Sequence, residues 1–524
     1  MVKWTKGSRE AAIIKKTYTI LRSKETLAAL LIILIGSALR LVLLGQYPAG
    51  LNQDEASSGY EAWALLHYGM DRNGVTAPVL FISWGSGQNV LYSYLSMPFI
   101  ALFGLNAFSV RLLAGLAGCA SLPIFYLLAK KLRGGLFGLL ALFVLAVNPW
   151  HIMLSRWALE SNLLPFFLLL GIWFLVLSRE RPWFLSISVG MFGISLYAYG
   201  TAFIFLPSFL VMSFALLVKR KALRWRPFLL AAVLFLVIAL PISICNILNI
   251  LHLGEIKILG VTLPALTQIR QKSTMSGGFS AAIQNLWAFL RLLYTQSDGL
   301  PWNSVKGFGL FYGVPGLFVA ALGFISLLYD LKKRKVSDSE FFMLFAFLSS
   351  LIAAFLIDIN INRINMAFLP IIYFQAVGLF FLTRIWGRRV TCVIVPAMAL
   401  VCFLFSLHYF TDVQKTLSVS FFEGFGGAIR YAETLDKDTV WITTEVNAPY
   451  IYVLFYNKIP PGDFQRSVQY INPDSAFRQV AGFGKYRFGG PRPETNAVLI
   501  LHRANTSGYA IEAIFGNYAV ATLP

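Results

Sequence analysis

Long runs of apolar residues recur along this chain from Leu27 to Phe410. A helix that crosses a bilayer needs about 20 mostly apolar residues, because the hydrocarbon core is about 30 Å thick. The 524 residues are 57% hydrophobic and only 13% charged, and the mean hydropathy is +0.68. A soluble multidomain enzyme is therefore excluded. The chain is predicted to be an α-helical polytopic membrane protein.

The basic residues are grouped in short segments that alternate with the apolar runs. This pattern is the positive-inside signature, which assigns such segments to the cytoplasm. The net charge of +20 is explained by these segments, so no nucleic-acid partner is needed. More than half of the 44 Lys and Arg residues lie in 3–24, 130–133, 179–181, 219–226, 332–335 and 384–389.

Combining the apolar runs with the basic segments predicts about 11 crossings, with residues 1–26 inside and the C-terminus outside. The stretch 88–105 is interrupted by Pro98, so we expect an interfacial or re-entrant helix there, although a crossing is not excluded by the pattern. The predicted crossings are 27–45, 107–128, 135–149, 162–178, 183–199, 201–218, 227–248, 310–329, 340–357, 365–383 and 390–409.

Three long segments are expected on the outside: the loop 45–106, the loop 249–309 and the tail 411–524, which flank or follow a transmembrane domain at 27–410. Thr439–Glu445 and Ala497–His502 have the composition of strands. The tail is therefore predicted to form a small extracytoplasmic α/β domain. The four cysteines fall inside apolar runs and indicate no disulfide framework.

Two adjacent carboxylates, Asp54 and Glu55, follow a Pro-Ala-Gly break just after the first crossing. One interpretation is a solvated loop in which Asp54 caps the following helix. The other is function, because desolvation near a membrane disfavours both charges and makes the pair a poor choice for stability alone.

Two further outer positions carry charge. Arg156 and Glu160 are four residues apart, which would place them on one helical face, either as a local ion pair or as part of a site. Arg363 follows Asn362 between two crossings, where it could act as an interfacial anchor or bind a ligand. Carboxylates and guanidinium groups at the outer leaflet suit a reaction on a lipid phosphate.

Several segments together resemble a known family. They are Arg40, residues 48–55 (Pro-Ala-Gly-Leu-Asn-Gln-Asp-Glu), 69–74 (Gly-Met-Asp-Arg-Asn-Gly) and 103–112 (Phe-Gly-Leu-Asn-Ala-Phe-Ser-Val-Arg-Leu), with 148–151 (Asn-Pro-Trp-His), 155–156 and 362–370. The combination resembles the protein O-mannosyltransferase and aminoarabinose (lipid A) transferase group of the GT-C glycosyltransferases. These are integral membrane enzymes that use polyprenyl-phosphate sugars. The resemblance spans most of the membrane region but not the tail.

The resemblance implies a hexosyl- or pentosyltransferase that moves a sugar from a polyprenyl-phosphate-linked donor to a hydroxyl of a protein, lipid or glycan. The family's catalytic carboxylate lies at the position of Asp54, and its mechanism is a single inverting displacement. A sugar on a lipid phosphate already has a good leaving group, so the enzyme mainly needs a base for the acceptor hydroxyl. We expect a prokaryotic plasma-membrane protein of the cell envelope, with its active site outside.

Roles for the other residues follow from that reaction. Glu55 and Glu160 would orient the acceptor or the sugar, and Arg363 would hold the departing phosphate by charge-assisted hydrogen bonds. No ligand spacing demands a metal, although some relatives place a divalent ion near the lipid phosphate. The remaining candidates for substrate binding are Tyr60, His151, Arg156 and Asn362.

The loop 249–309 contains an amphipathic stretch, Phe279 to Tyr294. It could close over the bound donor as a lid, or it could lie on the headgroups as an interfacial helix. At the level of the whole chain, a transporter or lipid flippase is the main alternative to an enzyme. Transporters usually carry ionisable residues near mid-bilayer, whereas the predicted crossings here are nearly free of charge.

Overall fold

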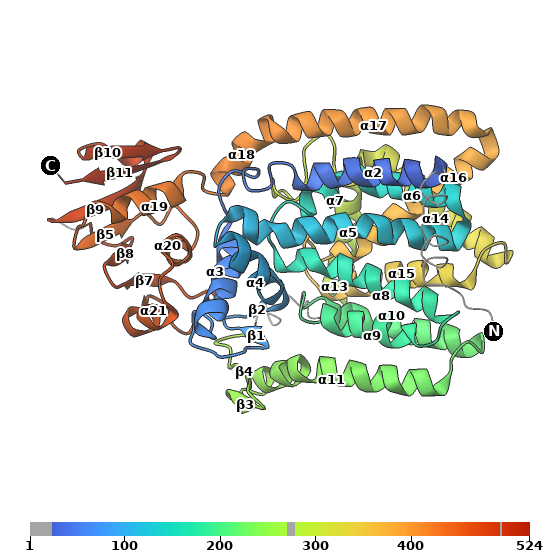
Figure 1. Ribbon diagram of the computed structural model, residues 1–524, viewed down its shortest axis with the longest axis horizontal. Helices are drawn as coiled ribbons and strands as arrows, with labels where there is room; N and C mark the ends of the chain where they lie inside the picture. Colours follow the sequence, from blue (N-terminus) through green and yellow to red (C-terminus); the bar gives the residue numbers. More distant parts are fainter. Residues whose placement is uncertain (1–23, 270–277, 493–494, 524) are drawn as a thin grey trace, which may run out of the picture.

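The computed structural model describes residues 24–269, 278–492 and 495–523. Figure 1 shows a bundle of roughly parallel helices and, at one end of it, a separate domain that contains the β-strands of the C-terminal region. Helices suit a bilayer because each one satisfies its own backbone hydrogen bonds where no water is available. The molecule is therefore mostly helical, as the apolar runs predict.

Each of the predicted crossings coincides with a helix. Within the described residues, 8 of these helices are long and apolar enough to cross a membrane, namely α5, α8 with the turn before it, α10, α11 and α14 to α17. The helices are α2 (Lys24–Leu41), α5 (Ala107–Arg133), α6 (Gly135–Ala146), α8 (Leu164–Ser178), α9 (Phe184–Ser195), α10 (Ala202–Lys219), α11 (Trp225–Ile250), α14 (Gly313–Lys332), α15 (Phe341–Leu356), α16 (Phe368–Trp386) and α17 (Arg388–Phe410).

Three of the predicted crossings coincide with helices that are more charged or shorter than these eight. Helix α2 carries Lys24, Glu25 and Arg40, while α6 and α9 have 12 residues each. The number of crossings thus stays a prediction. The cytoplasmic N-terminus expected at 1–26 lies almost entirely outside the described residues.

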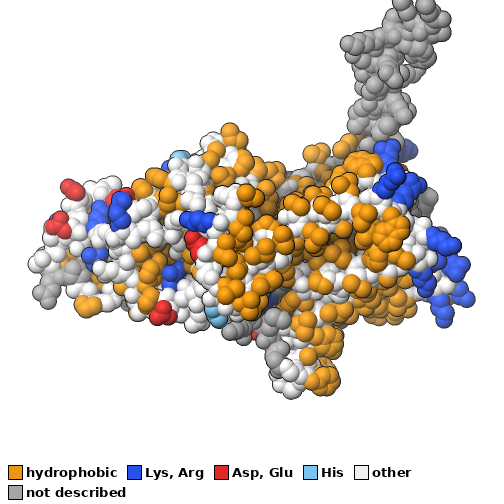
Figure 2. Space-filling view, turned by 90° about the horizontal axis from the view of Figure 1, so that it is seen from below, with side chains coloured by type: hydrophobic (Ala, Val, Ile, Leu, Met, Phe, Trp, Pro, Cys, Tyr) orange, Lys and Arg blue, Asp and Glu red, His pale blue; other side chains and the backbone are white. Residues whose placement is uncertain are grey.

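Helix α16 forms the centre of the bundle, because 89% of its apolar stretch is buried inside the protein. The corresponding share is 22% for α11 and 11% for α17. Figure 1 shows α11 and α17 along opposite edges of the bundle. Their exposed apolar side chains suit contact with lipid. Figure 2 shows hydrophobic side chains covering the helical part of the molecule and Lys and Arg gathered at the end away from the C-terminal domain.

The loop 45–106, which is expected on the outside from the sequence and which keeps the name first outer loop, is itself folded. Helix α3 (Gln53–Tyr68) ends at Gly69, whose φ of 69° is the left-handed conformation that glycine adopts readily. Strands β1 (Leu80–Phe81) and β2 (Gln88–Asn89) pair antiparallel, and α4 (Leu91–Phe103) follows with Pro98 inside it. The expected helix at 88–105 is therefore present, and α4 packs against α3 and α5.

The second outer segment, 249–309, contains a hairpin of β3 (Ile256–Ile258) and β4 (Val261–Leu263) and the amphipathic helix α13 (Phe279–Thr295). Helix α13 exposes Phe279, Trp287 and Tyr294. Exposed aromatic side chains favour the interfacial alternative for this helix. Part of the lid prediction falls on 270–277, outside the described residues.

The C-terminal domain is built on a mixed 7-stranded sheet of order β10-β11-β9-β5-β8-β7-β6, in which β5 runs parallel to β8 and β9. The two strands predicted in the tail are confirmed as β5 and β9. Its elements are α18 (Asp412–Ser420), α19 (Phe425–Glu433), β5 (Thr439–Ile442), α20 (Pro449–Asn457), α21 (Pro461–Ser467), β6 (Gln469–Tyr470), β7 (Val480–Phe483), β8 (Tyr486–Phe488), β9 (Ala497–His502), β10 (Ala510–Phe515) and β11 (Tyr518–Thr522).

Direct contacts join this domain to the first outer loop. The amide of Leu51 donates to the carbonyl of Phe421 at 2.7 Å, and the hydroxyl of Tyr452 donates to the carbonyl of Leu51 at 3.1 Å. Gly50 has a φ of +87°, and a Cβ there would lie 2.1 Å from the Phe421 oxygen. The close approach requires glycine, so the loop and the domain form one continuous region.

Candidate active site

The acidic pair lies in the first turn of α3. The side chain of Asn52 accepts a hydrogen bond from the Asp54 amide at 3.0 Å, and the Asn52 amide donates to Glu55 Oε2 at 3.0 Å. This is a capping box, which satisfies amides that have no partner inside the helix. The helix dipole also favours negative charge in this turn. Asn52, rather than Asp54, is thus the residue that caps the helix.

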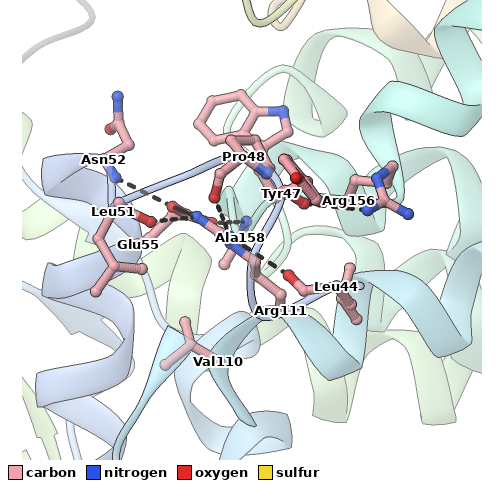
Figure 3. A network of polar contacts seen from close by, with 12 residues as sticks. Leu44, Tyr47, Pro48, Leu51, Asn52, Glu55, Val110, Arg111, Arg156 and Ala158 are labelled. Atoms are coloured by element: carbon pink, nitrogen blue, oxygen red, sulfur yellow. Dashed lines mark hydrogen bonds and ion pairs between the residues drawn. The ribbon is translucent and has the colours of Figure 1, made fainter. Parts of the chain in front are cut away.

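Glu55 is fully buried and forms a two-point ion pair with Arg111 of α5 (Figure 3). Arg111 Nε lies 2.7 Å from Oε1, and Nη2 lies 2.8 Å from Oε2. The Ala158 amide also donates to Oε1, at 2.9 Å. These partners, together with the capping amide, surround the carboxylate. The geometry therefore does not support the expected contact of Glu55 with substrate.

Arg111 also fixes the chain that leads to the acidic pair. Its guanidinium donates to the carbonyls of Leu44, Pro48 and Gly50, at 3.3, 2.7 and 2.7 Å. Arginine suits this task because its five N–H groups are held in a rigid planar array. Glu55 and Arg111 together define the path of the loop before α3.

The expected pairing of Arg156 with Glu160 on one helical face is wrong. Helix α7 (Pro149–Leu154) ends before Arg156, and Glu160 begins a separate short 3-10 helix, η1 (Glu160–Leu163). The Asn162 side chain holds the intervening turn by donating to the carbonyls of Leu154 and Trp157. The helical spacing is interrupted there, so the rule for residues four apart does not apply.

Arg156 instead binds backbone near the end of α2. Its guanidinium donates to the carbonyls of Leu39, Val42 and Tyr47, at 3.0, 2.9 and 3.2 Å (Figure 3). The same group lies 4.8 Å from the ring centre of Phe410, a cation–π distance. This side chain therefore joins α2 to α17, and its contacts do not place it at a substrate.

Asp54 is half-buried and lines a cavity of about 330 Å³ between the start of α3 and the C-terminal domain, which we term the Asp54 cavity. Trp84 and Tyr450 contribute aromatic surface to it, and polar groups also face it. Aromatic rings with a few polar groups are typical of ligand cavities. The polar lining includes Gln53, Thr444, Asn447, Arg478 and Gln479.

Glu160 and Arg363 line a second cavity, of about 320 Å³, which we term the Glu160 cavity. Its apolar wall comes from α10 and α11, which contribute Phe203 and Ile242. The Glu160 carboxylate accepts a hydrogen bond from the Asn89 amide. Arg363 Nη1 lies 3.6 Å from the Asp358 carboxylate, and the Arg363 side chain keeps 21% of its surface exposed. A carboxylate and a guanidinium thus line one cavity together with an apolar wall.

The segment from Trp84 to Asn89 separates the two cavities. Trp84 lines the Asp54 cavity, whereas residues 86–89 line the Glu160 cavity. Gln88 attaches this segment to α3, because it accepts from the Ser57 hydroxyl at 2.9 Å and donates to the Ser58 hydroxyl at 3.2 Å. This segment is not recognisable in the sequence, since isolated amides and serines in a loop give no characteristic spacing.

A buried ion pair packs against the ring of Trp84. Glu61 Oε1 lies 3.1 Å from Arg72 Nε, and the Arg72 guanidinium lies 4.6 Å from the centre of the Trp84 ring. Burial raises the pKa of the Glu61 carboxyl, and the charge of Arg72 partly offsets this shift. Arg72 belongs to the segment 69–74, which carries part of the family resemblance. Its ion pair with Glu61 is visible only in the fold.

The remaining candidates differ in position. The Tyr60 hydroxyl donates to the carbonyl of Ile459 at 2.6 Å, so this buried side chain joins α3 to the C-terminal domain. His151 Nδ1 lies 2.8 Å from Nη2 of the buried Arg40, where it packs between helices. Asn362 is half-buried beside Arg363 and lines neither cavity. Of the predicted residues, Asp54, Glu160 and Arg363 therefore line cavities.

No group of three or more His, Cys, Asp or Glu side chains that could hold a metal ion is found in the described ranges of the chain.

Residues 88–244 match the family model described as dolichyl-phosphate-mannose-protein mannosyltransferase. These residues include much of the wall of the Glu160 cavity. No curated protein matches the sequence.

The fold is similar to that of ArnT from Cupriavidus metallidurans. The structure of ArnT bound to undecaprenyl phosphate gives a TM-score of 0.59 at 14% identity, over 94% of this chain and 97% of that chain. Its apo state gives a TM-score of 0.58 at 14% identity, over 95% and 98%. The Archaeoglobus fulgidus oligosaccharyltransferase tethered with an acceptor peptide gives a TM-score of 0.51 at 13% identity, over 84% of this chain and 64% of that chain.

The chain thus shares the fold of ArnT, the GT-C type of fold that the resemblance in the sequence implies. It is similar to the O-mannosyltransferase and ArnT group in residues 88–244 and in its fold.

Proposed function

We propose that the protein is a membrane glycosyltransferase that moves a sugar from a polyprenyl-phosphate-linked donor to an acceptor hydroxyl at the outer face of the membrane. The observation that carries the proposal is the Glu160 cavity, in which Arg363 and Glu160 stand beside apolar side chains. An apolar wall suits the prenyl chain, and a guanidinium suits a phosphate. The structural similarity to ArnT bound to undecaprenyl phosphate supports this choice of donor.

The Glu160 cavity is the proposed donor site. Phe203, Ile204 and Ile242 would contact the first prenyl units, and Arg363 would face the phosphate. Arg363 can serve both the bound donor and the departing phosphate, because the negative charge on the phosphate grows as the sugar leaves. Glu160, at the same cavity, would accept hydrogen bonds from sugar hydroxyls.

The Asp54 cavity is the proposed acceptor site. Asp54 takes the proton from the acceptor hydroxyl, and the acceptor oxygen forms a bond to the anomeric carbon. The bond between that carbon and the phosphate oxygen breaks, and the phosphate leaves with the electron pair. One displacement inverts the anomeric centre. The segment from Trp84 to Asn89 lies between the two cavities, so the acceptor hydroxyl and the anomeric carbon would have to meet at its edge.

Occupying the donor cavity provides a direct test. Asn246 lines the Glu160 cavity, whereas its neighbour Ile247 is 53% exposed on the same helix. We expect Asn246→Trp to abolish binding of polyprenyl phosphate to the purified protein and Ile247→Trp to leave it unchanged. Equal binding by the two variants and the wild type would contradict the assignment of this cavity.

A further inference from the structure

A third cavity lies at the end of the helical bundle away from the C-terminal domain. Its volume is about 270 Å³, and it is formed by the ends of α5 and α16 and by the turn after α14. Arg133, Arg334, Lys335 and Arg384 all line it. Figure 2 shows Lys and Arg gathered at this end of the molecule.

Most of this positive charge is not neutralised by the protein. Arg133 is buried and pairs with Asp330 at 2.9 Å and with Glu340 at 2.7 Å. In the described part of the chain, Arg334, Lys335 and Arg384 have no carboxylate within ion-pair distance. The cavity therefore presents three cations to an incoming group.

Two of these cations lie in a tight turn after α14. Arg334 has a φ of 53°, the left-handed conformation that is uncommon for residues other than glycine. The Lys335 amide donates to the Asp330 carbonyl at 2.9 Å, which closes the turn. Arg384, on α16, lies 4.9 Å from the ring centre of Phe380. Two segments, the turn after α14 and the end of α16, thus contribute the three unpaired cations that line the cavity.

Apolar side chains also line the cavity. Leu132, Val336 and Phe380 contribute to a lining that is otherwise polar, and Ile385 and Trp386, which follow Arg384 in the chain, are exposed. Positive-inside orientation explains Lys and Arg at this end, but it does not require them to share a cavity with apolar side chains. Cations with apolar side chains beside them at the bilayer edge match the headgroup of an anionic lipid.

We propose that this cavity binds the phosphodiester headgroup of an anionic phospholipid. The phosphate faces Arg334, Lys335 and Arg384, while the glycerol and the first acyl carbons rest on Leu132 and Phe380. Free phosphate would use the cations but not the apolar side chains of Leu132, Val336 and Phe380, so the lipid is favoured. The site lies at the opposite end of the bundle from Asp54, and it does not depend on the proposed reaction.

The test compares two pairs of substitutions in the full chain. Arg334→Gln with Arg384→Gln removes two cations from the cavity, whereas Lys332→Gln with Lys333→Gln removes two exposed cations that do not line it. Both pairs lower the charge of this end equally. The proteins are placed in nanodiscs of phosphatidylcholine and phosphatidylglycerol, and retained lipid is measured by native mass spectrometry.

We expect the wild type and the Lys332/Lys333 control to retain phosphatidylglycerol in preference to phosphatidylcholine. The cavity variant should lose about tenfold or more of that preference, since losing a direct hydrogen bond between charged groups typically costs about tenfold or more. Arg384→Gln alone, at an exposed helix end, should show a smaller loss in the same direction. Equal loss in cavity and control variants would overturn the proposal, because surface potential would then explain the binding.

A second arm separates the lipid from free phosphate. Millimolar inorganic phosphate should leave the retained phosphatidylglycerol unchanged. Displacement of the lipid by phosphate alone would overturn the assignment to a lipid headgroup. Thermal unfolding of each variant, expected to match the wild type, verifies that lost lipid does not report lost folding.

Discussion

Asp54 and Glu55 are neighbours in the sequence, yet their side chains have different surroundings. Glu55 points inward to Arg111 and is fully buried, whereas Asp54 is half-buried at a cavity. Successive residues on a helix are about 100° apart, so one can face the core while the next faces a site. At this scale the sequence located the acidic pair correctly, but only the fold distinguishes the two roles.

The buried pair gives a prediction about stability. Glu55→Gln removes the charge that compensates the buried Arg111, and breaking a buried ion pair typically costs about 3–5 kcal/mol. We expect a clearly lower midpoint of thermal unfolding in detergent. Asp412→Asn is the control, because Asp412 forms an exposed pair with Lys415, and it should melt like the wild type.

The same substitution also separates two roles for Glu55. A variant that melts at the wild-type temperature but has lost sugar transfer would contradict the structural role. Glu55 would then be a residue that contacts the substrate. Arg111→Lys provides a second measure, since lysine keeps the charge but not the planar array of donors. It should also melt below the wild type.

Arg156 and His151 illustrate why single residues are hard to assign from sequence. A polar group in an apolar region indicates an unusual contact, but the partner can be backbone as easily as substrate. Arg156 bonds three carbonyls, and His151 accepts from Arg40. Both partners are more than 100 residues away in sequence, so neither contact is visible in local spacing.

Among the elements, the membrane helices were predictable because long apolar runs favour one structure in lipid. The strands of the C-terminal domain were harder to predict from the sequence, because β6 has only two residues and β8 only three. The segment from Trp84 to Asn89 was not predicted as a unit, because residues 88–89 were expected to begin the helix 88–105 but form strand β2. Its position depends on residues 475–478 on one side and on Gln88 on the other.

Gly85 tests this segment as a unit. Its φ is +114°, and a Cβ would lie 2.7 Å from the Ser475 carbonyl oxygen, at the contact with the C-terminal domain. Gly85→Ala should loosen that contact, lower sugar transfer and raise the rate at which protease cleaves the C-terminal domain. Backbone strain of this kind typically costs about 1–3 kcal/mol.

Gly74→Ala is the matched control for Gly85→Ala. Gly74 lies in the same loop with a φ of +78°, but the nearest atom to its Cβ is a side-chain carbon of Gln465 at 4.0 Å. The control carries the conformational cost without the clash. Equal cleavage and equal activity in the two variants would show that the contact at Gly85 does not position the site.

At the scale of the whole molecule, alternating apolar and basic segments predict both the bundle and its orientation. The proposed site and the C-terminal domain lie at one end, and the basic segments gather at the other (Figures 1 and 2). The positive-inside rule predicts that the basic end faces the cytoplasm. What the sequence could not supply is the packing of the C-terminal domain against the first outer loop, since it depends on contacts distant along the chain.

The orientation is tested by labelling single cysteines in cells. In a Cys392→Ser background, which removes the exposed native cysteine, Lys221→Cys lies in a basic segment and Asp474→Cys lies in the C-terminal domain. A maleimide that does not cross the membrane should label residue 474 and not residue 221. Labelling of residue 221 alone would invert the topology and move the site to the cytoplasm.

The central claim is that Asp54 is the base of a sugar transfer. Asp54→Asn keeps the size of the side chain but cannot take the acceptor proton, and losing a general base typically lowers the rate by about 10² to 10⁴. Donor binding should survive, since Arg363 and the apolar wall lie in the other cavity. Arg363→Ala should instead weaken donor binding as well as turnover, because a phosphate contact acts before and during the reaction.

The decisive measurement is therefore the rate of sugar transfer from a polyprenyl-phosphate donor by purified Asp54→Asn protein, with donor binding determined on the same sample. We expect wild-type donor affinity together with a rate reduced by about a hundredfold or more. A rate close to that of the wild type would contradict it, because Asp54 would then serve only the structure of the first turn of α3.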